Sequence, residues 1–146
     1  MIFNLLAYLM ATPNLPATED TRADLNYFEA VNTNNDTIPF LADDDYEAGD
    51  MILWGPYVGI VNKDVASGSW GSLRDKDGIL VTTRQVATGS TFATVGNPVW
   101  FNETTGEVSD TEAAGLVDIG PLATALDANS VISFYKRRYY VESELT

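Results

Sequence analysis

Carboxylates are the side chains with which this chain is best supplied for chemistry, and glycosidases use two of them as acid and base. The 146 residues include 21 Asp and Glu but neither His nor Cys, which excludes imidazole and thiolate chemistry. The densest group is Asp43-Asp44-Asp45. Consecutive side chains point apart in an extended segment. The sequence therefore predicts a solvated acidic loop at residues 43–45, not a catalytic pair.

Other site chemistries have even less support. Calcium binding is the alternative for the acidic loop, because hard cations take several oxygen ligands. Neither this loop nor Asp75-Lys76-Asp77-Gly78 has the EF-hand spacing. There is no Walker lysine motif and no G-x-G-x-x-G, and Ser130 has no histidine to activate it. We therefore expect no catalytic residue, no metal and no cofactor, and a protein that is not an enzyme.

Three tryptophans offer binding chemistry instead, because indole rings stack on sugars and anchor protein interfaces. Trp54 and Trp100 lie among Val, Ile, Leu and Phe within predicted strands, so we expect them in the core. Trp70 lies in a stretch of small residues, Ser67 to Ser72. It is predicted to be an exposed interface residue in a loop.

The basic cluster of the chain is Lys136-Arg137-Arg138, followed by Tyr139-Tyr140. Basic residues beside aromatics are also found in single-strand nucleic-acid binding, but the net charge of −13 disfavours nucleic acid and anionic membranes. We interpret the five residues as a contact with an acidic partner surface or with the protein's own acidic loop. A neighbouring copy is one such partner, because the first 62 residues hold ten acids and one base, Arg22.

The first 26 residues are predicted to form an extended N-terminal arm that acts as a hydrophobic hook for another subunit. The alternatives are a strand that packs under the domain and a flexible terminus. Its apolar tip contains Ile2, Phe3, Leu5, Leu6, Tyr8 and Leu9. Both helix and strand suit this run, and Pro13 and Pro16 stiffen the stretch that follows. A signal peptide requires basic residues before its apolar run, and none precedes this one. The run is also too short for a bilayer span. We therefore expect synthesis in the cytoplasm.

Short strands separated by turn residues are expected to position these groups, and they indicate an all-β domain over residues 27–146. The expected fold is a compact β-sandwich or barrel of short antiparallel strands. Strands are predicted at 27–31, 38–41, 51–54, 57–61, 79–83, 92–95, 98–101, 107–109, 116–119 and 131–135, and one helical turn at 122–126. Pro39 predicts an edge strand, and Gly55-Pro56 predicts a hairpin. The length suits a single domain.

Beyond residue 26 the order and spacing of several segments resemble the small tailed-bacteriophage head decoration proteins, also called capsid cement proteins. The segments are EAGDMIL at 47–53, YVGIV at 57–61, VGNPVWF at 95–101, TGEV at 105–108, GLVDIG at 115–120 and VISF at 131–134. The chain departs from the family pattern at Asn97, where the family has Asp. Residues 1–26 extend beyond the usual start of the family, so the resemblance says nothing about the arm.

The resemblance implies a β-rich structural protein that binds the outside of the expanded phage shell, often as a trimer. The expected partners are the major capsid protein and further copies of this chain, as a homotrimer or a dimer, with no nucleic acid and no membrane. The expected location is the outer capsid surface of the virion. The alternative is a carbohydrate-binding β-sandwich, displayed on a virion or cell surface, that uses Trp70 and nearby loops.

Overall fold

The computed structural model describes residues 28–30 and 37–145, and within them the regular secondary structure consists of strands. The strands are β1 (Phe28–Ala30), β2 (Thr37–Leu41), β3 (Met51–Trp54), β4 (Tyr57–Val61), β5 (Trp70–Arg74), β6 (Ile79–Thr83), β7 (Pro98–Asn102), β8 (Glu107–Ser109), β9 (Val117–Thr124), β10 (Ile132–Lys136) and β11 (Val141–Glu142). No helix in this part of the chain is long and apolar enough to cross a membrane. The predicted all-β class is confirmed. The predicted arm, residues 1–26, lies outside the described residues.

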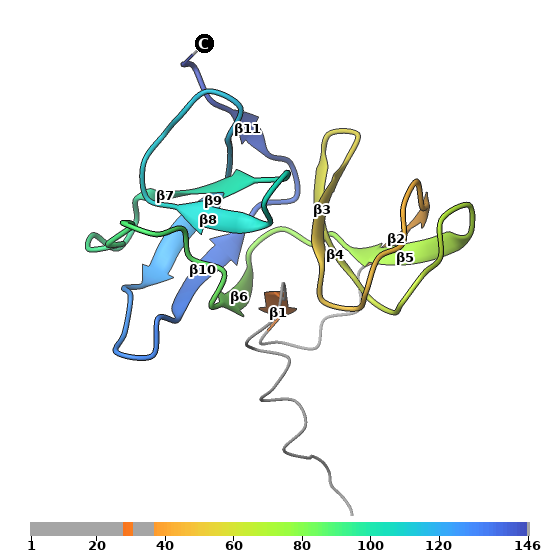
Figure 1. The fold of residues 1–146 in the computed structure, drawn as a ribbon, viewed down its shortest axis with the longest axis horizontal. Coiled ribbons are helices and arrows are strands. Elements are labelled where there is room, and N and C mark those ends of the chain that lie inside the picture. Colours follow the sequence, from red (N-terminus) through yellow and green to blue (C-terminus); the bar gives the residue numbers. More distant parts are fainter. Residues whose placement is uncertain (1–27, 31–36, 146) are drawn as a thin grey trace, which may run out of the picture.

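The larger sheet has seven antiparallel strands and curves into a half-barrel (Figure 1). Its order is β1-β6-β10-β9-β7-β8, and β11 pairs with β9. The register of β9 shifts against both β10 and β7, and irregularities of this kind bend a strand. Gly120 lies there at φ +139°, and a Cβ would collide with the carbonyl oxygen of Tyr135. The bend therefore depends on a residue without a side chain.

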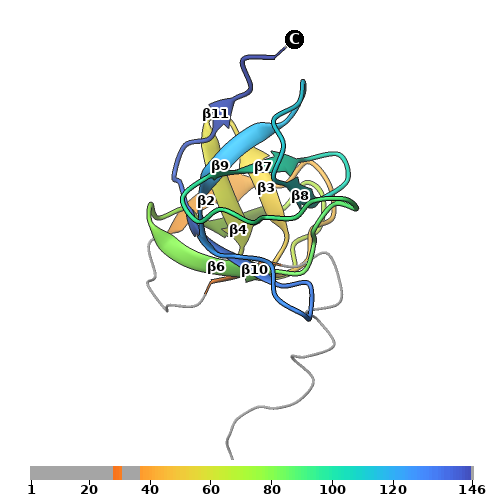
Figure 2. The same cartoon turned by 90° about the vertical axis from the view of Figure 1, so that its left-hand side faces the viewer.

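The smaller sheet has four strands in the order β2-β5-β4-β3. The predicted hairpin is confirmed, because Trp54 pairs with Tyr57 across the Gly55-Pro56 turn. The predicted edge position of Pro39 is also confirmed, since β2 ends the sheet. Figure 2, turned by 90°, shows the two sheets one behind the other.

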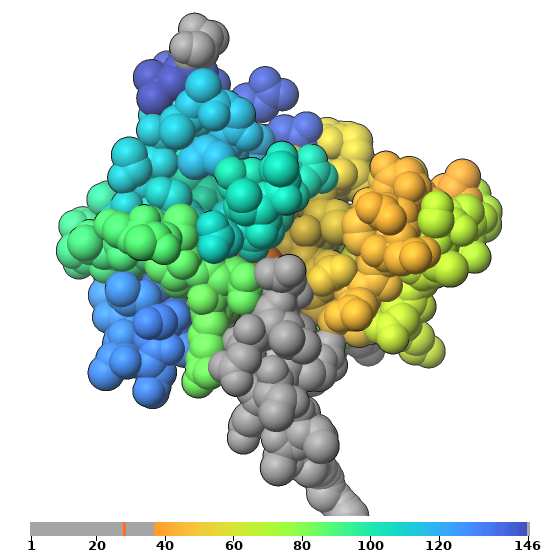
Figure 3. All heavy atoms as spheres, viewed as in Figure 1, coloured from red at the N-terminus to blue at the C-terminus, as the bar shows by residue number. Residues whose placement is uncertain are grey.

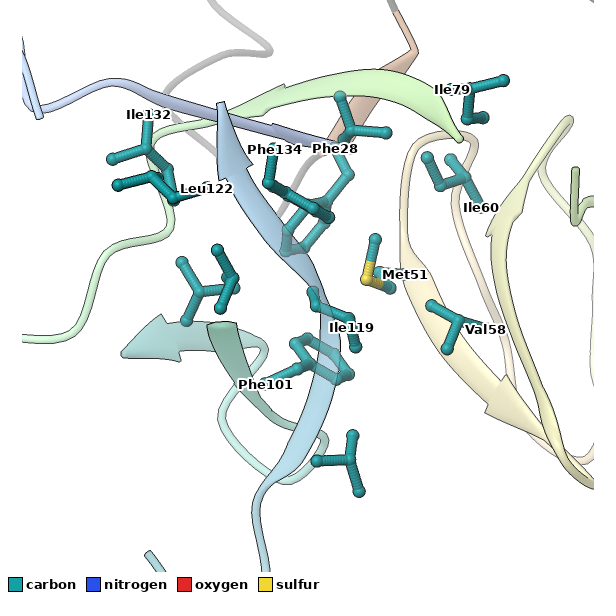
Figure 4. Close-up of a cluster of buried hydrophobic side chains, with 14 of the residues drawn as sticks. Phe28, Met51, Val58, Ile60, Ile79, Phe101, Ile119, Leu122, Ile132 and Phe134 are labelled. Atoms are coloured by element: carbon teal, nitrogen blue, oxygen red, sulfur yellow. The ribbon is translucent and has the colours of Figure 1, made fainter. Parts of the chain in front are cut away.

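The main hydrophobic core fills the space between the two sheets. Figure 4 shows Phe28, Phe101 and Phe134 directed toward one another, with Met51 and Val58 approaching from the smaller sheet. The ring of Phe28 meets those of Phe101 and Phe134 edge-on, with centroids 5.9 and 6.3 Å apart.

A second, smaller core lies on the opposite face of the four-stranded sheet, around Phe40 and Leu73. The β3–β4 hairpin is therefore covered on both faces, which explains its unbroken apolar sequence. Trp100 is buried as predicted, and Trp54 is half-buried against Phe40, with ring centroids 5.6 Å apart.

Two predicted elements are wrong. Residues 92–95 form a loop and not a strand, because Phe92 adopts a φ of 44° with its side chain buried in the core. Residues 122–126 do not form a helical turn. Leu122 and Thr124 end β9 and pair with β10 instead, so non-local pairing overrides the local helix propensity of this segment.

Two strands carry no strand signal in the sequence. Trp70 opens β5 and is not in a loop, and β11 pairs with the start of β9. The sequence does not predict β5, because the small residues from Ser67 to Ser72 leave little alternation of apolar and polar side chains.

Candidate interaction surface

The basic segment at residues 136–140, here called the sheet seam, joins the two sheets. It begins at the end of β10 and then runs beside the start of β4. The amide of Val58 donates to the carbonyl oxygen of Arg138 at 2.8 Å. Tyr139 forms an antiparallel bridge with Tyr57. The seam therefore belongs to both sheets and keeps them together.

Lys136 lies entirely inside the protein, with 0% of its surface exposed. Its Nζ donates to the carbonyl oxygens of Val58 at 2.8 Å, Asp75 at 3.1 Å and Arg137 at 2.8 Å. Burial lowers the pKa of Lys136 to about 8, although the carboxylates of Asp75 and Asp77 oppose this shift. The expectation that Lys136 contacts a partner is therefore wrong, because its ammonium bonds to the interior of its own chain.

The two arginines of the seam pair with acidic residues of the same chain. Arg137 approaches Asp118, with Nη2 3.3 Å from Oδ2. The Nε of Arg138 lies 3.2 Å from Oδ2 of Asp75, an ion pair without hydrogen-bond geometry. The sequence left open a contact with the protein's own acidic loop. The acids found here are Asp75 and Asp118 instead, so much of the seam's positive charge is matched internally.

The tyrosines of the seam differ in exposure. The ring of Tyr139 is tilted against that of Tyr57, with centroids 5.3 Å apart, and half of Tyr139 is exposed. Tyr140 packs against the main core. Of the two, Tyr139 is the one with surface available to a partner.

Trp70 is the most exposed large hydrophobic residue among those described, with 69% of its surface accessible. It stands opposite Leu41 in the β2–β5 ladder, and Leu41 is 41% exposed. Side chains of directly opposed residues lie on the same face of an antiparallel pair. Trp70 and Leu41 therefore form one exposed apolar pair.

This pair belongs to a larger surface, the β2–β5 outer face, which comprises Thr37, Pro39, Leu41, Trp70, Ser72 and Arg74. These side chains share one face because alternate residues of a strand point the same way. Arg74 stands opposite Ile60 of β4, and Ile60 packs into the main core. The outer face is thus the continuation of the sheet face that the larger sheet covers at β3 and β4. Figure 3 shows β2 and β5, in orange and lime, at the end of the molecule away from the larger sheet.

The acidic loop lies at the same end of the sheet as Trp70. Beyond the last ladder pair, the amide of Ala42 donates to the carbonyl oxygen of Ser69 at 2.9 Å. Oδ1 of Asp45 then accepts from the amide of Ser67 at 2.8 Å. These bonds attach the acidic loop to the segment that leads into Trp70, so the apolar pair has an acidic rim.

The acidic loop also borders a hollow of about 600 Å³ that reaches the turn at residues 103–106. Tyr46 donates to Asp43 at its edge. Burial, together with the bond and charge of Asp43, raises the pKa of Tyr46 above its usual range. Across the hollow, Glu103 accepts from the amide of Leu53 at 3.2 Å. No group of three acidic, His or Cys side chains in the described residues is arranged to hold a metal ion.

Asp110 has a structural role that sequence reasoning missed. Its Oδ2 accepts from the amide of Thr91 at 2.8 Å, the hydroxyl of Thr91 at 2.9 Å and the amide of Phe92 at 3.0 Å. Burial alone raises the pKa of Asp110, but these bonds and one from Thr111 outweigh it and lower the pKa to about 2. No local signal reveals the role, because the partners lie 18 and 19 residues away.

The predicted contact residues differ in where they lie. Ile2, Phe3, Leu5, Leu6, Tyr8 and Leu9 lie outside the described residues. Of the other predicted contacts, Trp70 and Tyr139 are exposed, Arg137 and Arg138 are partly exposed and paired, Tyr140 is partly buried and Lys136 is buried. Trp70 lies in β5 of the four-stranded sheet, whereas the seam lies between β10 and β4.

Comparison with protein families matches residues 31–138 to phage cement proteins. The chain belongs to the phage cement protein family. The matched span exceeds two thirds of the chain and confirms the resemblance expected from the sequence. No curated protein and no solved structure matches the chain. Within this cement protein, the span contains the β2–β5 outer face and the seam as far as Arg138, whereas residues 1–30 lie outside it. Membership assigns the chain a structural, capsid-associated role in a bacteriophage virion.

Proposed function

We propose that this cement protein binds the outer surface of a phage capsid and stabilises the expanded shell without catalysing a reaction. The observation that carries the proposal is the family match, which spans nearly the whole β domain. Three acidic side chains support a structural role, since Asp110 anchors a loop and Asp118 and Asp75 pair with arginines.

The charge of the protein suits attachment to a protein shell. A net charge of −13 keeps the free protein soluble and away from DNA. Many copies on one shell share the mechanical load, so modest affinity per copy is sufficient. We propose a homotrimer as the bound form, with a dimer as the other possibility, and native mass spectrometry of the purified protein distinguishes them.

Co-sedimentation with DNA-filled heads that lack the protein tests the attachment. We expect saturable pelleting at a fixed ratio to the major capsid protein, and that ratio indicates which symmetry sites are occupied. Heads that already carry the protein are the control, because their sites are filled. If folded protein stays in the supernatant although the undecorated heads are intact and pellet, the proposal is wrong.

Stabilisation needs a separate measurement, because a protein can bind a shell without reinforcing it. Heads with and without bound protein are heated in the presence of a DNA-binding dye, and release of the genome is followed by fluorescence. We expect release at a higher temperature from decorated heads. Equal release temperatures would leave attachment intact but refute reinforcement.

A further inference from the structure

The β2–β5 outer face continues a sheet face that is buried in the main core at β3 and β4, but here none of the described elements covers it. At β3 and β4 the same side of the sheet carries Val58 and Ile60, which the larger sheet buries. At β2 and β5 it carries Leu41 and Trp70, which are exposed. Adjacent exposed apolar side chains with a polar rim are typical of interaction sites, and Trp is enriched where interfaces concentrate their binding energy.

A partner must approach this surface from its face and not from its edge. The amide of Ala42 bonds to Ser69, directly before β5, so alternation along the strand directs the amides of Phe40 and Ile38 to β5. The backbone of Pro39 therefore faces the open edge, where it has no N–H to offer. A proline in this position blunts an edge against strand addition. Recognition then depends on the side chains of Trp70 and Leu41.

Charge selects the kind of partner. Carboxylates of the acidic loop and Asp64, which accepts from the amide of Ala48, surround this end of the sheet. The base next to Asp64 in the chain is Lys63, whereas Arg74 lies at the other end of the outer face, opposite Thr37. A second copy would bring the same negative rim. It also has little positive charge to offer from the sheet seam, because Lys136 is buried and both seam arginines are paired internally.

We propose that the β2–β5 outer face docks on the capsid shell, at an apolar recess of the major capsid protein that is bordered by Lys or Arg. This inference rests on the proposed function and adds the surface and the chemistry of the recognised site. Trp70 and Leu41 enter the recess, and the acidic loop faces its basic border. Arg–indole contact is a further attraction that such a border supplies.

The test measures binding of variants to heads that lack the protein, by quantitative co-sedimentation over a range of salt concentrations. Trp70→Ala is expected to weaken binding by at least about tenfold, as truncation of a central aromatic does, and Leu41→Ser is expected to weaken it less. Asp44→Asn removes a charge but keeps the side-chain oxygen that accepts from the amide of Asp45 at 2.8 Å. It is expected to reduce the salt dependence of head binding. Tyr135→Ala is the matched control, because Tyr135 is an exposed aromatic on the larger sheet.

The outcomes separate this inference from the proposed function. If wild-type protein does not pellet, the proposed function fails. If wild type pellets and Trp70→Ala pellets equally well, the function stands and the docking surface is wrong. Melting curves check each variant, and Leu41→Ser decides the matter if Trp70→Ala is unfolded. Loss of self-association in Trp70→Ala with unchanged head binding, or specific sugar binding that Trp70→Ala abolishes on a glycan array, would also overturn the inference.

Discussion

Replacing Lys136 by Met tests whether the sheet seam holds the two sheets together. Met has a similar length and no donor, so it fills the same space while removing three hydrogen bonds. The carbonyl oxygens of Val58, Asp75 and Arg137 lose the ammonium that they share at 2.8 to 3.1 Å. These carbonyls come from β4, from the segment after β5 and from the seam itself, so the loss falls where the sheets meet.

Two opposing effects set the magnitude. A buried acceptor that loses its donor costs about 1–3 kcal/mol, which for three carbonyls sums to roughly 6 kcal/mol. Against this, the lowering of the Lys136 pKa from 10.5 to about 8 means that burial and the nearby charges together disfavour the charged form by roughly 3 kcal/mol, and Met relieves that net cost. The difference predicts that Lys136→Met lowers the free energy of unfolding by about 3 kcal/mol, and the melting temperature by roughly 9 °C.

Urea unfolding at pH 7, followed by tryptophan fluorescence and by circular dichroism, measures this free energy. Lys63→Met is the matched control, because Lys63 is exposed and the same substitution there should change stability by less than about 0.5 kcal/mol. A Lys136→Met protein at least as stable as wild type would refute the reasoning. It would mean that the cost of burying the ammonium exceeds the value of its three bonds, as happens in some buried ion pairs.

The pH dependence supplies an independent check of the same group. Between pH 8 and 10.5 the unfolded chain holds the Lys136 proton and the folded chain releases it, because the folded pKa is the lower one. Stability rises with pH wherever the unfolded state binds more protons. The stability difference between wild type and Lys136→Met is therefore expected to widen from pH 8 toward pH 10.5. A constant difference would show that Lys136 does not titrate in this window.

Three further predictions concern the loop, the bend and the arm. Asp110→Ala should lower the free energy of unfolding by about 1 kcal/mol after allowance for solvent screening. The stabilisation by the Asp110 carboxylate is present above pH 3.8 and is lost as the pH falls toward about 2. The urea midpoints of wild type and variant should therefore converge in acid. Gly120→Ala should lower the free energy of unfolding by more than about 3 kcal/mol, because the new methyl meets the backbone of Tyr135 in a conformation that suits glycine. Gly89→Ala is the control and should cost clearly less in the same melts, because Gly89 has φ +91° but open space around it. Equal costs would contradict the steric argument. Deleting residues 1–26 should leave the melting temperature unchanged and weaken head binding, and a collapse of the melting transition would show that the arm belongs to the core.

Local chemistry was sufficient to predict much of the fold. The Gly55-Pro56 turn and the apolar runs on either side define the β3–β4 hairpin, and Pro39 defines the sheet edge, since each depends on backbone rules that act within a few residues. The errors occur where distant residues decide. Phe92 is anchored from Asp110, and Leu122 pairs with β10, so neither conformation follows from the neighbouring sequence.

The candidate surface shows the same division. The exposure of Trp70 follows from its small polar neighbours, and the structure confirms it. Its pairing with Leu41, 29 residues earlier, depends on the β2–β5 register. The sequence interpretation of Lys136 as a surface contact was wrong because a charge is normally solvated, and only the meeting of two sheets provides three carbonyl oxygens around its ammonium.

The sequence by itself determined an all-β chain with a strongly negative surface, no His and no Cys, and it indicated the cement protein family. These properties depend on composition, on short-range patterns and on the order of motifs, all of which can be read along the chain. The tertiary structure decided which basic groups are available to a partner and which sheet face stays uncovered. Both depend on contacts between residues far apart in sequence, and such contacts form only when the two sheets pack against each other.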